Sequence, residues 1–454
     1  MFIRIPRKDG RRFALLRAVS DTAAAEAADR RDEQMKIQIP GTEVLEKIYG
    51  QDAGEAALRY AALAAGFSAR FGAKKLQAEK VRFFSAPGRT EIIGNHTDHN
   101  GGRILAASIT MDTIAAAAPT GEDIVQIVSE GYAPVVLDLK RLGEVPKCEG
   151  TLSLAAGMLE AAQTYGYRVG GFCAYITSQV IPSAGVSSSA SFEMLLCAVL
   201  NELFNDGSMD LSHYARIGQY AENVWWKKSS GLMDQMACAA GGTIALDFGG
   251  GQVGCEHVDF GFDQIGMNLI ILNTGKGHAD LSAEYSAVPE EMRQAARACG
   301  GENLCDVEEE TFLQNLPDLR KKLGNDRAVL RALHWYAECR RVDDAVRAIR
   351  SGEKERITAL FRESGNSSWK WLQNCYVNTD PQEQPVCVAL SLAESFLQRS
   401  GRGACRVHGG GFAGVIAAAV PFEETAEFVS FMTPYLGAEN IYIMGIRQTG
   451  AVTV

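Results

Sequence analysis

The sequence contains no run of 18 consecutive apolar residues and no cysteine pair with the spacing Cys-x-x-Cys. The first absence predicts that no helix spans a membrane. The eleven cysteines are odd in number and scattered among apolar neighbours, as in Leu196-Cys197-Ala198, which excludes a disulfide framework or a paired-cysteine zinc site and indicates free thiols in a reducing compartment. The basic N-terminus lacks the apolar core of a signal peptide. We therefore expect a cytoplasmic protein with no membrane partner.

The chain also lacks an excess of basic residues. Its 45 Lys and Arg stand against 55 Asp and Glu, and the net charge is −10. This balance argues against nucleic acid as the main partner, although a local basic site for phosphates is compatible with it. The composition is that of a globular protein, and 454 residues exceed what one core usually supports, so we expect two domains.

The apolar pattern predicts an α+β protein in two lobes. Helical spacing at 54–72, 151–166 and 190–204 alternates with strand-like runs in the first half, and long helical stretches dominate after residue 283. Residues 1–42 are expected to form an N-terminal extension, of which 1–34 is peripheral to any chemistry. The predicted domains are 43–245 and 246–454.

The most polar stretch of the chain lies between Ala86 and Gly102 and reads Ala-Pro-Gly-Arg-Thr-Glu-Ile-Ile-Gly-Asn-His-Thr-Asp-His-Asn-Gly-Gly. A surface loop does not need so many hydrogen-bonding side chains, and a core cannot bury them without dedicated partners. The stretch therefore suits a small, hydroxyl-rich ligand.

A second candidate site is the Gly/Ser loop 181–190, which lies between a strand-like run and an apolar helical stretch. Small residues let the backbone approach a ligand, and the free N–H groups of a helix start attract anions. A serine-capped helix is the alternative interpretation, but three consecutive serines favour the anion site. No Gly-x4-Gly-Lys-Ser/Thr occurs in the chain, so the loop is not a Walker A loop.

Two glycine runs, 249–254 and 409–414, match Gly-x-Gly-x-x-Gly. Neither is followed by a helical pattern, so the dinucleotide-binding interpretation fails. We interpret 249–254 as a turn. The run 409–414 is flanked by Arg406 and His408 and is interpreted as a turn that lines a site.

Two carboxylates complete the candidates. Asp234 lies between apolar residues just after Lys227-Lys228 and is either a helix-start group or a buried catalytic base. Glu222 lies twelve residues earlier, on a helical stretch rich in Tyr and Trp. Taken by itself, it would be interpreted as a solvent-exposed charge.

Together, the segments 87–102, 182–191 and 406–414 resemble the three motifs of the GHMP small-molecule kinases. The first is similar to the galactokinase signature, in which Pro-Gly-Arg leads into Ile-Gly-Glu-His-Thr-Asp-Tyr-Asn. Ala221-Glu222-Asn223 and Met233-Asp234-Gln235 also match that family, and the resemblance covers residues 45–454. It implies a two-lobed GHMP kinase fold with the active site between the lobes, and a Mg²⁺-dependent enzyme that phosphorylates the anomeric hydroxyl of a sugar with ATP.

The resemblance also implies roles for individual residues. Asp234 would accept the proton of the anomeric hydroxyl, and Arg89 would keep Asp234 ionised and stabilise the transferring phosphoryl group. Ser189 and Glu222 would hold Mg²⁺. ATP would be bound by Pro182, Gly185, Val186, Ser187, Ser188, Ser189, Ala190, Gly410 and Gly411. The sugar would be bound by Arg89, Asn95, His96, Asp98, Gly231, Asp234 and Tyr285. We expect a monomer or a weak homo-oligomer.

The sequence departs from the galactokinase pattern at several positions. Asn95 replaces the Glu that contacts the 6-hydroxyl, Thr90-Glu91 replaces Val-Asn, and Lys227–Ser230 replaces a small glycine-containing turn. The second motif is one residue shorter between Pro182 and Gly185. His99 replaces the usual Tyr, and Ala413 replaces a Gly.

These departures leave three functions open. Loss of the Glu charge removes repulsion against a carboxylate at the 6-position, so galacturonate is an alternative substrate. Galactose is favoured, because an amide still bonds a neutral hydroxyl. An inactive sugar- and ATP-binding regulator is the other alternative, but the presence of Ser188, Ser189, Glu222, Asp234 and Arg89 favours an enzyme.

Overall fold

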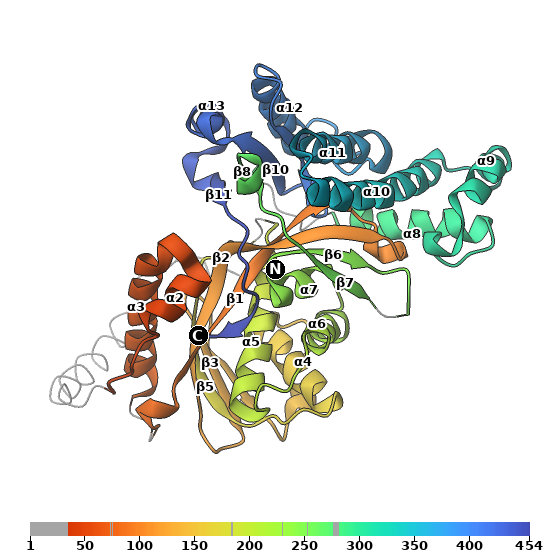
Figure 1. Cartoon of the computed structure of the whole chain (residues 1–454). Helices are drawn as coiled ribbons and strands as arrows, with labels where there is room; N and C mark the ends of the chain where they lie inside the picture. Colours follow the sequence, from red (N-terminus) through yellow and green to blue (C-terminus); the bar gives the residue numbers. More distant parts are fainter. Residues whose placement is uncertain are drawn as a thin grey trace, which may run out of the picture.

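The chain folds into two lobes, each built from a β-sheet and helices (Figure 1). The computed structural model describes residues 35–72, 74, 76–182, 185–228, 230–251, 253–275 and 281–454. The predicted α+β, two-lobed architecture is confirmed. The segment 1–34 of the expected extension lies outside the described residues, and 35–42 leads directly into the first helix of the first lobe.

The strands form two sheets. The first has eight strands, with the order β12-β1-β2-β5-β3-β4 and with β6 and β7 attached through β2. The second has four, in the order β11-β8-β10-β9. Among the described residues, β3 and β5 are the only strands that pair in parallel. The bounds are β1 Arg82–Ile93, β2 Arg103–Pro119, β3 Ile124–Ser129, β4 Val135–Asp138, β5 Phe172–Ser178, β6 Thr243–Asp247, β7 Gly254–Val258, β8 Met267–Asn273, β9 Ala404–His408, β10 Val415–Pro421, β11 Ile441–Met444 and β12 Val452–Thr453.

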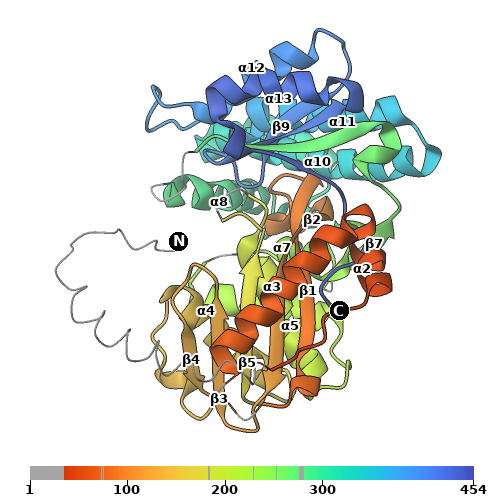
Figure 2. The same cartoon turned by 90° about the vertical axis from the view of Figure 1, so that its left-hand side faces the viewer.

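Helices cover both sheets, as Figure 2 shows with the second lobe above the first. The helices of the first lobe are α2 Thr42–Tyr49, α3 Ala53–Phe71, α4 Gly150–Thr164, α5 Ser188–Phe204, α6 Leu211–Tyr220 and α7 Met233–Ala240. Those of the second lobe are α8 Ser282–Ala298, α9 Glu309–Leu323, α10 Asp326–Ser351, α11 Lys354–Ser367, α12 Pro385–Leu397 and α13 Thr425–Leu436. Within the part of the chain that the structure describes, no helix has both the length and the apolar character needed to cross a membrane.

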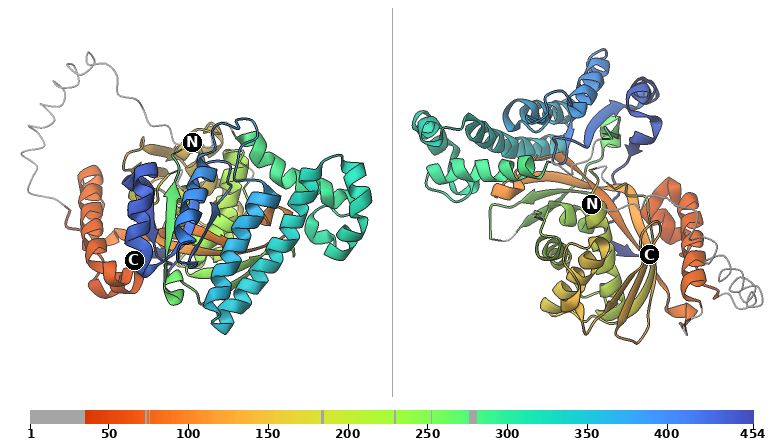
Figure 3. Two further views of the ribbon diagram at one scale, coloured as in Figure 1. Left: turned by 90° about the horizontal axis from the view of Figure 1, so that it is seen from above. Right: turned by 180° about the vertical axis from the view of Figure 1, so that it is seen from behind.

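The strands β1, β2 and β5 of the first sheet are largely buried on both faces, because adjacent residues point to opposite sides and helices cover each side. Phe83, Ile114 and Ala116 pack against α3, whereas Phe84 and Ala115 pack in the core formed by α4, α5 and α6. Figure 3 shows these two helical layers from behind, with α2 and α3 on one side of the strands. The near-continuous apolar strands of the sequence reflect this double burial.

The two lobes share one apolar core. Ile92, Leu105 and Ile109 of the first sheet cluster with Leu269 and Ala417 of the second. The same cluster contains Val180 and Val186, which flank the Gly/Ser loop. The lobe interface therefore packs the strand that carries Arg89, together with Val180 and Val186, against the second sheet.

The predicted division at residue 245 falls within β6, which pairs with β2 in the first sheet. After β11 the chain also returns to the first lobe, where Phe84 pairs with Thr453. Arg447 anchors this return by an ion pair of 2.8 Å to the buried Asp112. The domain boundaries of 43–245 and 246–454 stay a prediction.

Candidate active site

A carboxylate and a guanidinium from distant segments meet at the centre of the site. Asp234 lies in the first turn of α7, and Arg89 lies on β1 after a bulge in its pairing with β2. Arg89 Nε donates to Asp234 Oδ1 at 2.8 Å, and Arg89 Nη2 donates to Oδ2 at 3.0 Å. Such a two-pronged contact fixes the orientation of the carboxylate as well as its position.

Asp234 is held in its ionised form. Burial would raise its pKa, but the charge and hydrogen bonds of Arg89 act in the opposite direction, as do the charge of Lys228 and the hydroxyl of Ser187. The pKa of Asp234 is lowered from its ordinary value as a result. The start of a helix also favours a negative charge.

The Gly/Ser loop lies directly against this pair. Arg89 donates through its Nη1 to the carbonyl of Gly185 and through its backbone N–H to the carbonyl of Val186, the latter at 3.2 Å. Gly185 has a φ of +67°, and a Cβ there would overlap Val415 of the second lobe. Glycine is therefore required at this position both for its backbone conformation and for close approach of the two lobes.

Two of the serines after Gly185 donate hydrogen bonds to different carboxylates. Ser187, with a φ of +57°, donates its hydroxyl to Asp234 and precedes the first residue of α5. Ser189 Oγ donates to Glu222 Oε1 at 3.0 Å. Glu222 is 1 % exposed and lies on a π-helical turn, Ala221–Trp225. The structure thus brings Arg89, Asp234, Ser187, Ser189 and Glu222 together.

The surroundings of Glu222 include three groups that the sequence did not single out as site residues. Lys228 Nζ lies 2.7 Å from Glu222 Oε1, and Gln235 Nε2 lies 3.4 Å from Oε2 and 3.0 Å from the buried Glu193. Burial and the charge of Glu222 raise the pKa of Glu193 well above its ordinary range. The raised pKa favours the neutral form of Glu193 beside Gln235.

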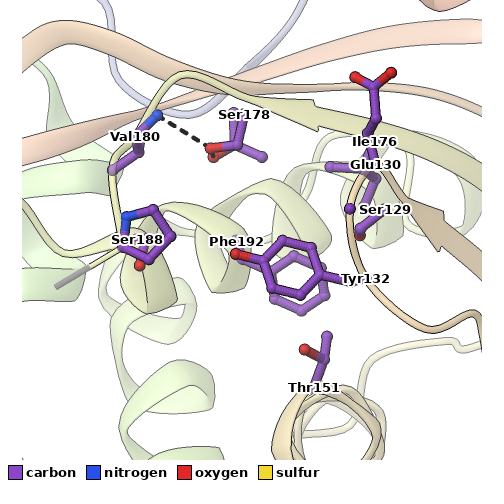
Figure 4. A pocket seen from close by; sticks show the side chains of 12 residues that line it. Ser129, Glu130, Tyr132, Thr151, Ile176, Ser178, Val180, Ser188 and Phe192 are labelled. Carbon is purple, nitrogen blue, oxygen red and sulfur yellow. Dashed lines mark hydrogen bonds between the residues drawn. The ribbon is translucent and has the colours of Figure 1, made fainter. Parts of the chain in front are cut away.

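A cavity of about 560 Å³ opens next to the Gly/Ser loop. It lies between the turn after β3, the start of α4, the end of β5 and the start of α5, and Figure 4 shows the side chains that line it. Ser188 and Pro182 form its border with the loop. The volume is that of a small-molecule site. The sequence carries no local motif for it, because its lining comes from five separate segments: Thr113, Ser129, Glu130, Gly131, Tyr132, Thr151, Ile176, Ser178, Val180, Pro182, Ser188 and Phe192.

Two of the other predicted sugar-binding residues, His96 and Tyr285, contact Gly410 and Gly411. His96 Nε2 lies 2.9 Å from the carbonyl of Gly410, and the Tyr285 hydroxyl donates to the carbonyl of Gly411 at 2.6 Å. Burial lowers the pKa of His96 to about 3, so its ring is neutral and Nε2 carries a proton toward that carbonyl. A Cβ on Gly410 would overlap the ring of Tyr285.

Asp98 and Gly231 are two further residues of the predicted sugar-binding set. A Cβ on Gly231 would overlap the Asp98 carboxylate, so the glycine allows the segment before α7 to approach the segment after β1. Asp98 therefore lies beside the chain that leads to Asp234.

Asn95, the last of the predicted sugar-binding residues, is buried and bonds to other protein groups. Its side chain is 0 % exposed, and its Nδ2 donates to the carbonyl of Gly409 at 2.8 Å and to Glu91 Oε1 at 3.1 Å. Its Oδ1 accepts from Asn374 Nδ2 at 2.8 Å. The amide is thus committed to protein partners, and its role as a sugar contact stays a prediction.

The charge beside Asn95 belongs to Glu91. This carboxylate is buried and pairs with the buried Arg406 at 2.6 Å. The galactokinase signature has Asn at position 91 and Glu at position 95, so this chain holds the same carboxylate–amide pair with its members exchanged. The departures at positions 91 and 95 look independent in the sequence, but the two side chains contact each other in the structure.

The residues present fit two of the groups that the family resemblance implies. The Gly/Ser loop and the adjoining cavity fit a nucleoside triphosphate. Ser189 Oγ and Glu222 Oε1 are hard oxygen donors 3.0 Å apart and suit Mg²⁺, which is usually completed by substrate phosphates and water. Lys228 already contacts the same Glu222 oxygen.

Comparison with known proteins agrees with this geometry. The family model for GHMP kinases N terminal domain matches residues 153–242, a range that contains the Gly/Ser loop, Glu222 and Asp234. This match and the fold define the class as a small-molecule kinase. The family model for galactokinase galactose-binding signature matches residues 65–119, which contain Arg89.

Curated galactokinases align with most of the chain. Those of Lactococcus lactis subsp. lactis (strain IL1403) and Bacillus subtilis (strain 168) are 29% and 26% identical over 380 and 377 residues. These alignments cover 81% and 80% of this chain and 89% and 90% of the two relatives.

Solved structures show the same relationship. The L. lactis galactokinase in complex with galactose superposes with a TM-score of 0.74 and 25% identity over 87% of this chain and 99% of that one. The Methanococcus jannaschii mevalonate kinase shares the fold with a TM-score of 0.57 at 14% identity, over 81% and 98% of the two chains. The chain belongs to the galactokinase family of the GHMP kinases, as the sequence motifs indicate.

Proposed function

We propose that the protein is a galactokinase, which transfers the γ-phosphoryl group of ATP to the anomeric hydroxyl of galactose. The observation that carries this proposal is the two-pronged Arg89–Asp234 pair, which lies against a Gly/Ser loop in a chain of this family. The free thiols that the sequence indicates support a cytoplasmic location, and a monomer or weak homo-oligomer stays the expectation for assembly.

The chain supplies position and charge for the transfer. Asp234 is ionised and accepts the proton of the sugar hydroxyl, while Arg89 keeps Asp234 oriented and balances charge on the transferring group. Phosphoryl transfer passes through a loose transition state, so positioning and neutralisation contribute more than a strong base would. Ser189 and Glu222 would hold Mg²⁺, which neutralises phosphate charge when it is bound.

The cavity beside the loop would take the adenine and ribose of ATP. It borders Ser188 and Pro182, so a nucleotide seated there would direct its phosphates toward the first N–H groups of α5 and onward to Asp234. In-line transfer then requires the sugar hydroxyl to lie on the side of Asp234 opposite to the nucleotide.

A substrate panel tests the function. ADP release should be measured with galactose, galacturonate, glucose, N-acetylgalactosamine and arabinose, and we expect the highest kcat/KM with galactose. Tight binding of one sugar with no turnover of any would replace the kinase assignment by the regulator. Absence of both binding and turnover would overturn both.

Galacturonate is the second candidate because Asn95 carries no charge and the charge of Glu91 is already paired with Arg406. The structure shows that Asn95→Glu alone is a poor test, since it would bury a second carboxylate beside Glu91. The double exchange Glu91→Asn/Asn95→Glu keeps one carboxylate and one amide in the pair.

We expect the double exchange to raise the ratio of kcat/KM for galactose over galacturonate at least about tenfold, since a unit charge within a few Å repels the acid by more than 1 kcal/mol. Glu91→Gln is the matched control, because it removes the buried charge without creating one at position 95. An unchanged ratio in a double variant that keeps the parental Tm would show that position 95 does not select the sugar.

A further inference from the structure

The ammonium group of Lys228 forms an ion pair with Glu222, the carboxylate that is expected to bind metal. Its Nζ lies 2.7 Å from Oε1 of Glu222, whose side chain is 1 % exposed, whereas the Lys228 side chain is 51 % exposed. The lysine side chain therefore reaches from an exposed position to a buried carboxylate. Lys227–Ser230 is also where the sequence departs from the small turn of the family.

The backbone fixes this placement. Lys227 has a φ of +55°, an uncommon conformation for a residue with a side chain, and it turns the chain back toward the π-helical turn. The backbone N–H of Lys228 then donates to the carbonyl of Glu222 at 3.0 Å. Two amides hold the far end of the segment, since Asn223 Oδ1 accepts from the Ser230 N–H at 2.8 Å and Gln219 Nε2 donates to the Ser230 carbonyl at 3.1 Å.

The two oxygens of Glu222 have different surroundings. Oε2 faces the fully buried Gln235, which in turn contacts the buried Glu193. Oε1 accepts from Ser189, the second hydroxyl of α5, and it is the oxygen that Lys228 contacts. A cation that arrives with a nucleotide at the start of α5 must therefore use the oxygen on which the ammonium lies.

We propose that Lys228 is a built-in cation of the phosphate site, which competes with a divalent cation for Glu222 Oε1 and binds the nucleotide phosphates when that cation is absent. This role rests on the proposed ATP-dependent function. Without metal, Lys228 cancels the charge of Glu222 and leaves a positive group near the phosphates. With metal, the ion takes Oε1 and the ammonium moves away into solvent, which the half-exposed side chain of Lys228 allows.

ADP binding with and without Mg²⁺ provides the test. Isothermal titration of the full chain should give the Kd of ADP in excess EDTA and in saturating Mg²⁺. In Lys228→Met the uncompensated Glu222 repels the phosphates, so we expect the Kd in EDTA to rise about tenfold while the Kd in Mg²⁺ changes little. The enhancement of ADP affinity by Mg²⁺ should therefore be about tenfold larger in this variant.

A second readout uses the metal itself. Mn²⁺ bound to the complex of protein and ADP can be counted by its electron paramagnetic resonance signal, without turnover. We expect the half-saturating Mn²⁺ concentration to fall about tenfold in Lys228→Met, because the competing ammonium is gone. Lys228→Arg keeps the charge and should remain close to the parent.

Lys227→Met is the matched control, since it removes the same charge one residue earlier, and it should leave both quantities unchanged. Lys228→Gln serves as a second neutral variant if Lys228→Met is poorly folded. Equal Mg²⁺ enhancement in the parent and both neutral variants would overturn the role of Lys228 and leave the kinase assignment intact. Failure of the parent to bind ADP under either condition would overturn both.

Discussion

Asp234→Asn is expected to lower kcat by about 10³-fold and to leave the Kd of the sugar within about threefold of the parent. The amide matches the carboxylate in shape but cannot accept the proton of the anomeric hydroxyl, and a positioned base contributes about 10² to 10⁴ in rate. The variant also leaves Arg89 without its charged partner in a buried place. Turnover by ADP release and sugar affinity by titration calorimetry are the two measurements.

The control for this variant is Asp247→Asn. Asp247 is an exposed carboxylate that pairs with Arg103, so the same chemical change is made outside the site. Exposed pairs contribute little to stability, and both activity and Tm should be unchanged. Retention of more than a tenth of the parental kcat in Asp234→Asn would remove the assignment of Asp234 as the base.

Arg89→Met is expected to lower kcat at pH 7 by about 10²-fold and to move the acidic limb of the pH profile to higher pH. The first effect follows from loss of a preorganised charge beside the transferring group. The second follows from the pKa of Asp234, which burial raises and Arg89 lowers. With Arg89 present, Asp234 stays ionised as the pH falls through the ordinary carboxylate range, and without it the burial effect dominates.

The direction in which the acidic limb moves can be measured in a profile of kcat/KM from about pH 4.5 to 9. In the parent, protonation of Asp234 should not reduce activity at the acidic end of this range, because Arg89 lowers its pKa. Arg89→Met should recover part of its lost activity as the pH rises and Asp234 ionises. Arg89→Lys keeps a charge but not the two parallel hydrogen bonds, and its limb should lie between the two. A limb at the same pH in all three proteins would show that Arg89 does not set the pKa of Asp234.

The sequence predicts most of the architecture because the apolar periods are strong. The expected helices 54–72 and 190–204 agree with α3 and α5 within two residues. Other elements are less visible. The polar stretch that begins at Ala86 has no strand-like apolar pattern, but β1 runs through it to Ile93, because the sheet and the second lobe supply partners for its polar side chains.

The site residues are predictable where a motif is local and are not where contacts cross the chain. Asp234 and Arg89 come from motifs, and so does Glu222. In the sequence, Lys228 cannot be distinguished from its neighbour Lys227. The left-handed backbone at Lys227 in the structure shows that Lys228 is the lysine that contacts Glu222. The exchange of Glu91 and Asn95 is hidden for a similar reason, since the bulge between Glu91 and Ile93 changes which side chains lie together.

The strand β12 has a consequence for how this protein is made. Its two residues pair with β1, although every element of the second lobe lies between them in the chain. During synthesis on a ribosome, β1 emerges early and waits for its neighbour until the whole second lobe has been translated. The first sheet thus closes last, and contacts of such long sequence separation fold slowly. Its unpaired edge is open to wrong partners for that time, so chaperone demand should concentrate on the lobe that is translated first.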